Sequence, residues 1–129
     1  MPEPAPLGVG IDLEDGGAFS HLSAAALRRA AARWLTPAER AWCSGQPSLG
    51  ESLLVVLCCK EAAFKAWSGG HAAHQVSLVM QGCATSGWAL VEDSPVQVRV
   101  DWRRRRGRVL ALAVATDRLK GSERPPDAL

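Results

Sequence analysis

Long hydrophobic runs are missing from this sequence. No stretch approaches the roughly 18 uninterrupted apolar residues of a membrane-spanning helix. The N-terminus also lacks the basic segment followed by an apolar one that is typical of a secretion signal. The sequence therefore predicts a cytoplasmic protein.

A strong charge of either sign is missing as well. The formal net charge is +2, from 15 Lys and Arg against 13 Asp and Glu, which is too close to neutral for a general nucleic-acid-binding protein. The basic residues are unevenly spread, because five arginines fall within residues 103–108. This run would attract an acidic partner or form a solvated turn, and the solvated turn is the favoured interpretation.

Disulfide and zinc signatures are also missing. The four cysteines form no Cys-x-x-Cys pair and no spacing of a disulfide framework. Cys58 and Cys59 are adjacent in an apolar run, where free cysteine behaves as a small hydrophobic residue. His71 and His74 are three positions apart, but solvated loop histidines are a better interpretation of them than a zinc site.

The sequence that is present fits one domain with a substantial core, because 129 residues of which 47% are hydrophobic can bury enough apolar surface. We expect a flexible lead over residues 1–6, one domain over 7–118 and a flexible tail over 119–129. Within the domain, periodicity and turn residues predict one strand, three helices and then a run of strands. The predicted elements are a strand at 7–14, helices from Ser20 or Ser23 to 34, at 36–44 and at 51–67, and strands at 75–80, 88–92, 96–102 and 108–116.

This order of elements predicts an α+β fold, an antiparallel sheet with about three helices packed on one face. In the first helix, Leu27, Ala30, Ala31 and Trp34 form an apolar stripe. In the second, Thr36 is the predicted N-cap, Pro37 takes the first helical position and Glu39 completes a capping box. A loop at 45–50 leads to the third helix, and residues 103–107 form the predicted tip of a hairpin.

The third helix, residues 51–67, carries charged groups at a helical spacing. Glu61 and Lys65 lie four positions apart on one face, while Lys60 points away from them. From spacing alone an ordinary surface ion pair is the favoured interpretation. The first strand supplies a possible counterpart, because Asp12 and Glu14 face the same way and two adjacent carboxylates favour a nearby cation. Solvated acids at a strand end are the alternative.

Three motifs together resemble the 4′-phosphopantetheinyl transferase superfamily, in the form of single-domain holo-acyl-carrier-protein synthases. They are Gly-Ile-Asp-Leu-Glu at 10–14, Leu-Thr-Pro-Ala-Glu-Arg at 35–40 and Lys-Glu-Ala-Ala-Phe-Lys-Ala at 60–66. The resemblance implies Mg²⁺-dependent transfer of the phosphopantetheine arm from coenzyme A to a serine of an acyl or peptidyl carrier protein, with release of adenosine 3′,5′-bisphosphate.

The resemblance also implies roles for particular residues. Asp12, Glu14 and Glu61 match the metal-binding acids, and Glu61, Lys65 and Asp12 match the catalytic groups. Lys60 and Lys65 match positions that contact the phosphates of coenzyme A. Leu57 departs from the family, which usually has an aromatic residue there, and an arginine expected soon after Asp12 in the short bacterial synthases is missing.

Partners follow from the same resemblance. The carriers of fatty acid or polyketide biosynthesis are typically acidic, and Arg28, Arg29 and Arg33 would receive one electrostatically. The arginines at 103–108 would bind the carrier or the 3′-phosphate of coenzyme A. A chain of this length matches the class in which identical subunits meet at the site, so a homo-oligomer is expected, with a trimer favoured. The alternative is a catalytically impaired member of the same fold that binds a carrier protein or a synthase.

Overall fold

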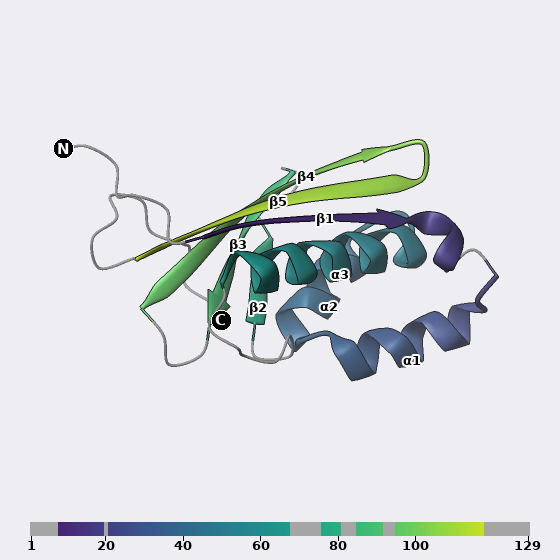
Figure 1. Cartoon of the computed structure of the whole chain (residues 1–129). Helices are drawn as coiled ribbons and strands as arrows, with labels where there is room; N and C mark the ends of the chain where they lie inside the picture. The colour runs from purple at the N-terminus through teal and green to yellow at the C-terminus, as the bar shows by residue number, and fades with distance from the viewer. Residues whose placement is uncertain (1–7, 20, 68–75, 81–84, 92–94, 118–129) are drawn as a thin grey trace.

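The computed structural model describes residues 8–19, 21–67, 76–80, 85–91 and 95–117. The predicted lead at 1–6, the tail at 119–129 and the segment with His71 and His74 lie outside the described residues. The elements, in chain order, are β1 (Gly8–Asp15), the short 3-10 helix η1 (Gly16–Ala18), α1 (Ala24–Trp34), α2 (Pro37–Ser44), α3 (Leu49–Ala66), β2 (Val76–Met80), β3 (Ser86–Val91), β4 (Val96–Arg105) and β5 (Arg108–Asp117) (Figure 1). None of these helices is long and apolar enough to cross a membrane.

The five strands form one antiparallel sheet in the order β1-β5-β4-β3-β2. β4 and β5 are joined by a two-residue turn, in which Arg106 has φ 53° and Gly107 has φ 76°. Two positive φ values in succession suit the right-handed twist of the flanking strands. The prediction of a hairpin tip over 103–107 is therefore wrong in its first part, because β4 continues through Arg105.

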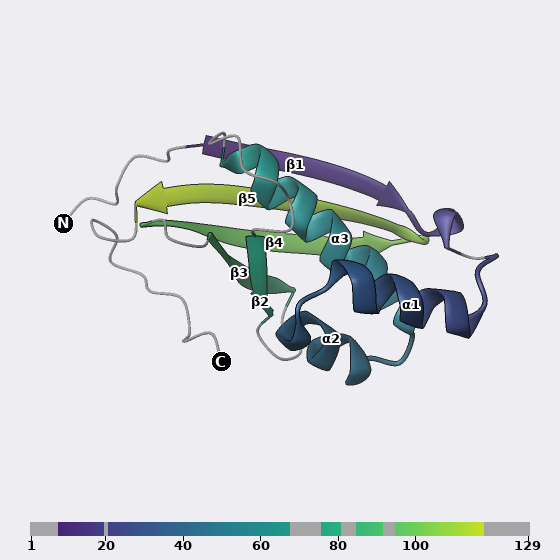
Figure 2. The same cartoon turned by 90° about the horizontal axis from the view of Figure 1, so that it is seen from below.

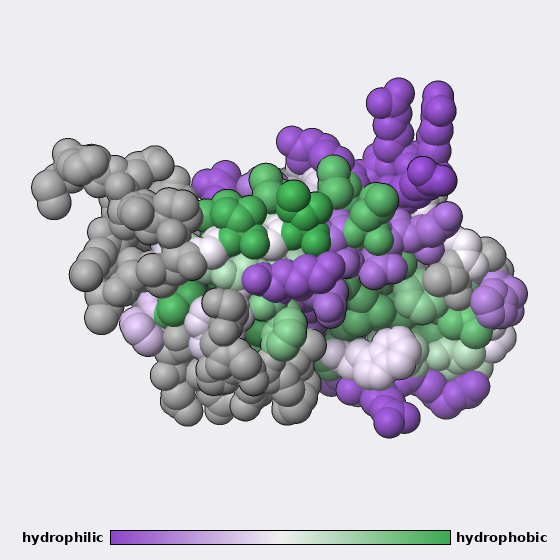
Figure 3. Space-filling view, viewed as in Figure 1, coloured by the Kyte–Doolittle hydropathy of each residue, from purple (hydrophilic) through white to green (hydrophobic). Residues whose placement is uncertain are grey.

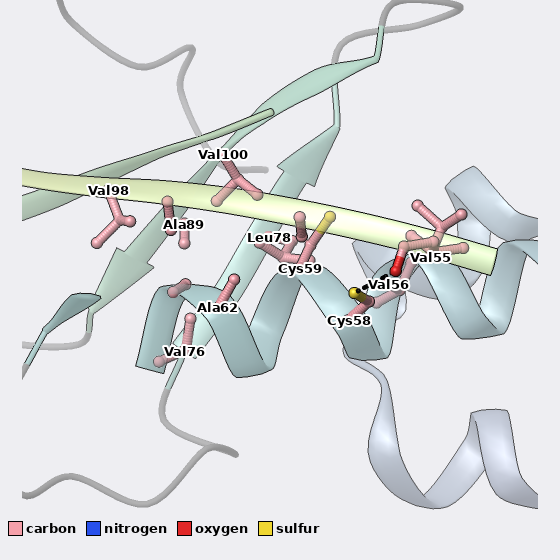
Figure 4. Close-up of a cluster of buried hydrophobic side chains, with 14 of the residues drawn as sticks. Val55, Val56, Cys58, Cys59, Ala62, Val76, Leu78, Ala89, Val98 and Val100 are labelled. Atoms are coloured by element: carbon pink, nitrogen blue, oxygen red, sulfur yellow. Dashed lines mark hydrogen bonds between the residues drawn. The ribbon is translucent and has the colours of Figure 1, made fainter. Parts of the chain in front are cut away.

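The three helices lie on one face of the sheet, which confirms the predicted α+β fold (Figure 2). α3 packs directly on β1, β4 and β5, and its residues 52–60 are buried except for the half-buried Leu57. Val55, Cys58 and Cys59 point from α3 into the core beneath the sheet (Figure 4). Burial raises the pKa of Cys58 to about 12, so this thiol is an inert core group, as the sequence predicted.

The boundaries of the helices differ from the prediction at two places. α3 begins at Leu49 because the Ser48 side chain caps it, accepting a hydrogen bond from the Glu51 amide at 3.3 Å. The predicted loop at 45–50 is therefore too long. In α1, Ser23 rather than Ser20 is the N-cap. Trp34 is 49% exposed, so it is not part of the buried stripe of α1.

Two glycines of β1 allow the strand to lie directly against α3. A Cβ atom on Gly8 would collide with the carbonyl oxygen of Ala66, and one on Gly10 would collide with the carbonyl oxygen of Ala62. Glycine in a strand permits such a close approach of two backbones. The contact fixes β1, with its acidic residues, at a short distance above the second half of α3.

Replacing Gly10 by alanine is expected to lower the free energy of unfolding by about 2 kcal/mol or more, because the new methyl group meets backbone atoms that cannot move independently. Gly50→Ala is the matched control, since its Cβ would meet only the Leu27 side chain at 3.6 Å. The control is expected to be neutral or slightly stabilising. Urea denaturation of both variants measures the difference, and equal losses would contradict the proposed backbone contact.

Candidate active site

Asp12 and Lys65 meet where β1 crosses α3. The Lys65 ammonium lies 2.9 Å from Oδ1 of Asp12 and donates a second hydrogen bond to the Ile11 carbonyl at 3.2 Å. Asp12 is buried, whereas the Lys65 side chain is 47% exposed. The hydrogen bond to Asp12 raises the pKa of Lys65 above its ordinary value, so the ammonium stays charged. The sequence pattern placed both residues on facing surfaces but did not predict that they would pair.

The second oxygen of Asp12 has no hydrogen-bond partner. Oδ2 is buried and unpaired in the described part of the chain. A buried carboxylate oxygen without a partner costs about 1–3 kcal/mol or more. This oxygen is therefore suited to a ligand that brings a positive charge or a hydrogen-bond donor.

Glu14 lies on the same face of β1 as Asp12, two residues further along. Burial raises the pKa of Glu14 above its ordinary value, and the neighbouring Asp12 carboxyl and the Glu61 charge raise it further, while Lys65 acts in the opposite direction. Ionising Glu14 is thus less favourable in the folded protein than in water, because the group is partly buried and negative charge is present nearby. A cation at this place would relieve that repulsion.

A hollow of about 400 Å³, which we call the acidic hollow, brings these acids together with residues from α1 and α3. Its lining consists of Asp12, Glu14, Arg33, Trp34, Leu57, Lys60 and Glu61. Glu61 is exposed on the face of α3 that also carries Lys65. The hollow therefore combines the predicted acids of β1 with the predicted acid of α3.

The acids fit Mg²⁺ in chemical type, and Asp12 Oδ2 has no hydrogen-bond partner among the described residues. Within the described ranges, however, no three His, Cys, Asp or Glu side chains converge closely enough to form a ligand set by themselves. Mg²⁺ commonly takes only one or two protein carboxylates and completes its shell with substrate phosphates and water. The residues present are consistent with such a partial ligand set.

Lys60 lines the same hollow, but its ammonium is held in a buried network. Its ammonium lies 3.0 Å from Oε1 of Glu39 and donates to the Trp34 carbonyl at 3.3 Å. Glu39 is completely buried and also accepts hydrogen bonds from the amides of Thr36 and Leu78, each at 2.8 Å. We call Lys60 and Glu39 the buried ion pair; it ties α2, α3 and β2 together behind the hollow.

The sequence predicted one contact of Glu39, the capping box with Thr36, but it did not predict that Arg33 and Trp34 line the hollow. The capping box of Thr36 and Glu39 is confirmed. Arg33 was predicted to attract an acidic carrier protein, and Trp34 to belong to the apolar stripe of its helix. The available signal was their place in the sequence, because the last turn of α1 immediately precedes the capped start of α2 and so lies near its buried glutamate.

Comparison with known proteins adds a family and a set of similar folds. The sequence model of the 4′-phosphopantetheinyl transferase superfamily matches residues 8–109. No curated protein sequence matches the chain significantly.

Among solved structures, a holo-[acyl-carrier-protein] synthase from Neisseria meningitidis has a TM-score of 0.70 at 19% identity, with 87% of this chain and 99% of that chain covered. A holo-(acyl-carrier-protein) synthase from Bacillus anthracis in complex with coenzyme A (3′,5′-ADP) has a TM-score of 0.67 at 19% identity, with coverages of 85% and 96%. The Helicobacter pylori synthase in complex with coenzyme A has a TM-score of 0.67 at 17% identity, with coverages of 84% and 99%. These structures share the fold of the chain over nearly its whole described length.

Proposed function

The chain belongs to the 4′-phosphopantetheinyl transferase superfamily, and on that premise we propose that it transfers the 4′-phosphopantetheine arm from coenzyme A to a serine of an acyl or peptidyl carrier protein. The observation that carries the proposal is that Asp12, Glu14 and Glu61 line the same hollow, with Lys65 bound to Asp12. A protein that only bound a carrier would not need three acids at the same place. The similar structures with bound coenzyme A support the choice of substrate.

In the proposed reaction, the serine oxygen forms a bond to the β-phosphorus of coenzyme A, and the bond from that phosphorus to the bridging oxygen breaks. The products are the phosphopantetheinyl-serine and adenosine 3′,5′-bisphosphate. Asp12, Glu14 and Glu61 would hold Mg²⁺, which when bound neutralises charge on the pyrophosphate. Catalysis would then consist mainly of positioning and electrostatic stabilisation.

Individual side chains would take the following parts. Glu61 is exposed and accepts the serine proton. Lys65 stays charged, and because its side chain is half exposed, the third N–H of its ammonium would contact a phosphate or protonate the leaving oxygen. Lys60 was also predicted to contact phosphate, but its ammonium is already bound by Glu39 and the Trp34 carbonyl. We therefore propose that Lys60 acts chiefly by shaping the wall of the hollow.

We further propose that the carrier protein approaches across α1. Arg28, Arg29 and Arg33 are exposed, and Arg33 also lines the hollow beside Trp34. An acidic carrier would be attracted to this surface and would bring its serine to the acids. The cytoplasmic location and the homo-oligomer, with a trimer favoured, remain predictions. The exposed positions of Glu61 and Lys65 leave space for a neighbouring subunit over the site.

A second candidate function is a catalytically impaired member of the same fold that binds a carrier protein or a synthase. It is favoured by Leu57, which lines the hollow where the family usually has an aromatic side chain. The two functions differ in whether any product forms, so one assay separates them.

The assay incubates the protein with coenzyme A, Mg²⁺ and an apo carrier protein and measures the intact mass of the carrier. We expect the carrier to gain the phosphopantetheine mass, and Glu61→Ala to lower the rate by about 100-fold or more. Glu51→Ala is the matched control, because Glu51 lies on the same helix but pairs with Arg104, outside the hollow. No gain of mass with several carriers would favour the binding module, and an active Glu61→Ala variant would contradict the role of Glu61.

A further inference from the structure

The strand that carries two of the acids, β1, has no apolar side chain on the face that lies against α3. Its inward positions are Gly8, Gly10, Asp12 and Glu14, whereas its apolar residues face the other way and are 55–60% exposed. In Figure 3 these apolar side chains belong to the green row along β1 and β5, and hydrophilic side chains lie beside that row where β1 passes over α3. Burial of its own apolar side chains therefore does not set the position of β1 over the helix, and other contacts must do so.

Contacts between β1 and α3 recur at a regular interval. The two glycines of β1 lie against Ala66 and Ala62, which are four residues apart on the helix. Two strand residues advance by about 6.6 Å and four helix residues by about 6 Å, so the same register continued brings Asp12 to Cys58. In the structure the Cys58 sulfur lies 3.4 Å from the Asp12 carbonyl oxygen. Because Asp12 has a side chain, the two backbones cannot meet here as they do at the glycines, and the thiol bridges them.

The Cys58 thiol also reaches β5. Its sulfur lies 3.5 Å from the carbonyl oxygen of Val109, the residue that pairs with Glu14 in the sheet. Figure 4 marks a hydrogen bond of the Cys58 sulfur with a dashed line. The thiol keeps its proton, because burial raises its pKa to about 12, so its S–H can donate to these oxygens. One unreactive thiol thus ties β1 to β5 at the positions of both acids.

The contacts of Asp12 hold its backbone and one of its carboxylate oxygens. Its carbonyl accepts a hydrogen bond from Cys58, and its Oδ1 accepts one from Lys65. Oδ2 is buried and has no hydrogen-bond partner in the described part of the chain. Water can reach the half-exposed Lys65 side chain but not the completely buried Cys58. The thiol is therefore the contact of Asp12 that solvent cannot replace.

We propose that Cys58 is a positioning residue for the acidic hollow, whose S–H holds the paired strands β1 and β5 at Asp12 and Glu14 and so fixes where the two carboxylates lie. Cys58 does not line the hollow, so it can act only through these acids. Groups that orient a metal ligand from behind commonly affect metal affinity. The effect on transfer rests on the proposed function, whereas the effect on β1 does not. The alternative is that Cys58 only fills space in the core.

The test compares Cys58→Ala, which removes the donor, with Cys58→Ser, which keeps one. Cys59→Ala is the matched control, because Cys59 is adjacent, equally buried and makes no hydrogen bond through its sulfur within the described ranges. Both alanine variants delete one buried sulfur atom and should lower the free energy of unfolding by similar amounts. Only Cys58→Ala should raise the hydrogen-exchange rates of the amides of residues 11–14 relative to those of β4, by about threefold. Cys58→Ser should keep these rates close to the wild type. NMR without Mg²⁺ measures them.

The second measurement is the Mg²⁺ concentration that gives half-maximal transfer. Cys58→Ala should raise it by about threefold or more, Cys58→Ser should restore most of the loss, and Cys59→Ala should leave it unchanged. Equal effects of the two alanine variants, each confirmed as folded by circular dichroism, would overturn the proposal. A serine variant that behaves like the alanine variant would do so too, as would faster exchange in β1 with an unchanged Mg²⁺ requirement. If the wild type shows no transfer, the proposed function fails, and the exchange rates alone decide whether Cys58 holds the strand.

Discussion

Replacing Asp12 by asparagine is expected to lower the rate of phosphopantetheine transfer by about 100-fold or more while the protein stays folded. The amide is close in shape to the carboxylate, and its oxygen can still accept the Lys65 hydrogen bond now made by Oδ1. The amide nitrogen would then take the place of the unpaired Oδ2, where it cannot bind a cation. The chemical change is thus confined to the unpaired oxygen, the atom that would be available to Mg²⁺.

The transfer assay is repeated at increasing Mg²⁺ to measure this effect. If the variant needs more Mg²⁺ and has a lower limiting rate, Asp12 contributes both to the binding of Mg²⁺ and to the transfer step. Asp101→Asn is the matched control, because Asp101 is a half-buried acid on β4 that pairs with Arg99 outside the acidic hollow. A fully active Asp12→Asn variant with the wild-type Mg²⁺ response would show that the acids of β1 have another role.

Replacing Glu39 by alanine is expected to lower the free energy of unfolding by about 3–5 kcal/mol, the largest stability effect we anticipate. The change leaves the Lys60 ammonium buried without its counter-charge. It also leaves the amides of Thr36 and Leu78 without their acceptor. Since small domains are stable by about 5–15 kcal/mol in total, the variant would be close to unfolding at room temperature.

A double-mutant cycle separates the ion pair from the rest of the network. Lys60→Met alone leaves a buried carboxylate, and Glu39→Gln alone leaves a buried ammonium, so each single variant should be strongly destabilised. The double variant leaves no unpaired buried charge. Its loss in free energy of unfolding should therefore be smaller than the sum of the two single losses, by at least about 1 kcal/mol. Urea denaturation provides the free energies. Losses that are small and additive would contradict a coupled buried pair.

Local features of this fold could be predicted from the sequence because their causes are local. The capping box needs only residues three positions apart, and the alternation of β1 placed Asp12 and Glu14 on one face. The spacing of Glu61 and Lys65 likewise placed them on one face of α3. In each case a helix or strand period fixed the geometry, so no knowledge of distant contacts was needed.

The partners of these residues depend on packing and could not be predicted in the same way. Glu39 binds Leu78 of β2, which is distant in sequence, and no local pattern specifies that contact. Trp34 belongs to an apolar stripe by period, but α1 covers α3 only with its other apolar residues, so the indole remains half exposed. The pattern of β1 also suggests an inward apolar face, whereas its glycines face α3 and its apolar side chains face outward.

The position of β1 in the sheet determines when the proposed site can form during folding. β1 pairs with no described strand except β5, so that Gly8 meets Ala115 across almost the whole domain. Closing so long a loop costs entropy before any contact is gained, and contacts of this kind slow folding. During synthesis, the strand that carries Asp12 and Glu14 is made early but has no sheet neighbour until β5 has left the ribosome. A partly made chain would therefore be unable to assemble the acidic hollow, and catalytic competence would arise in one of the last steps of folding.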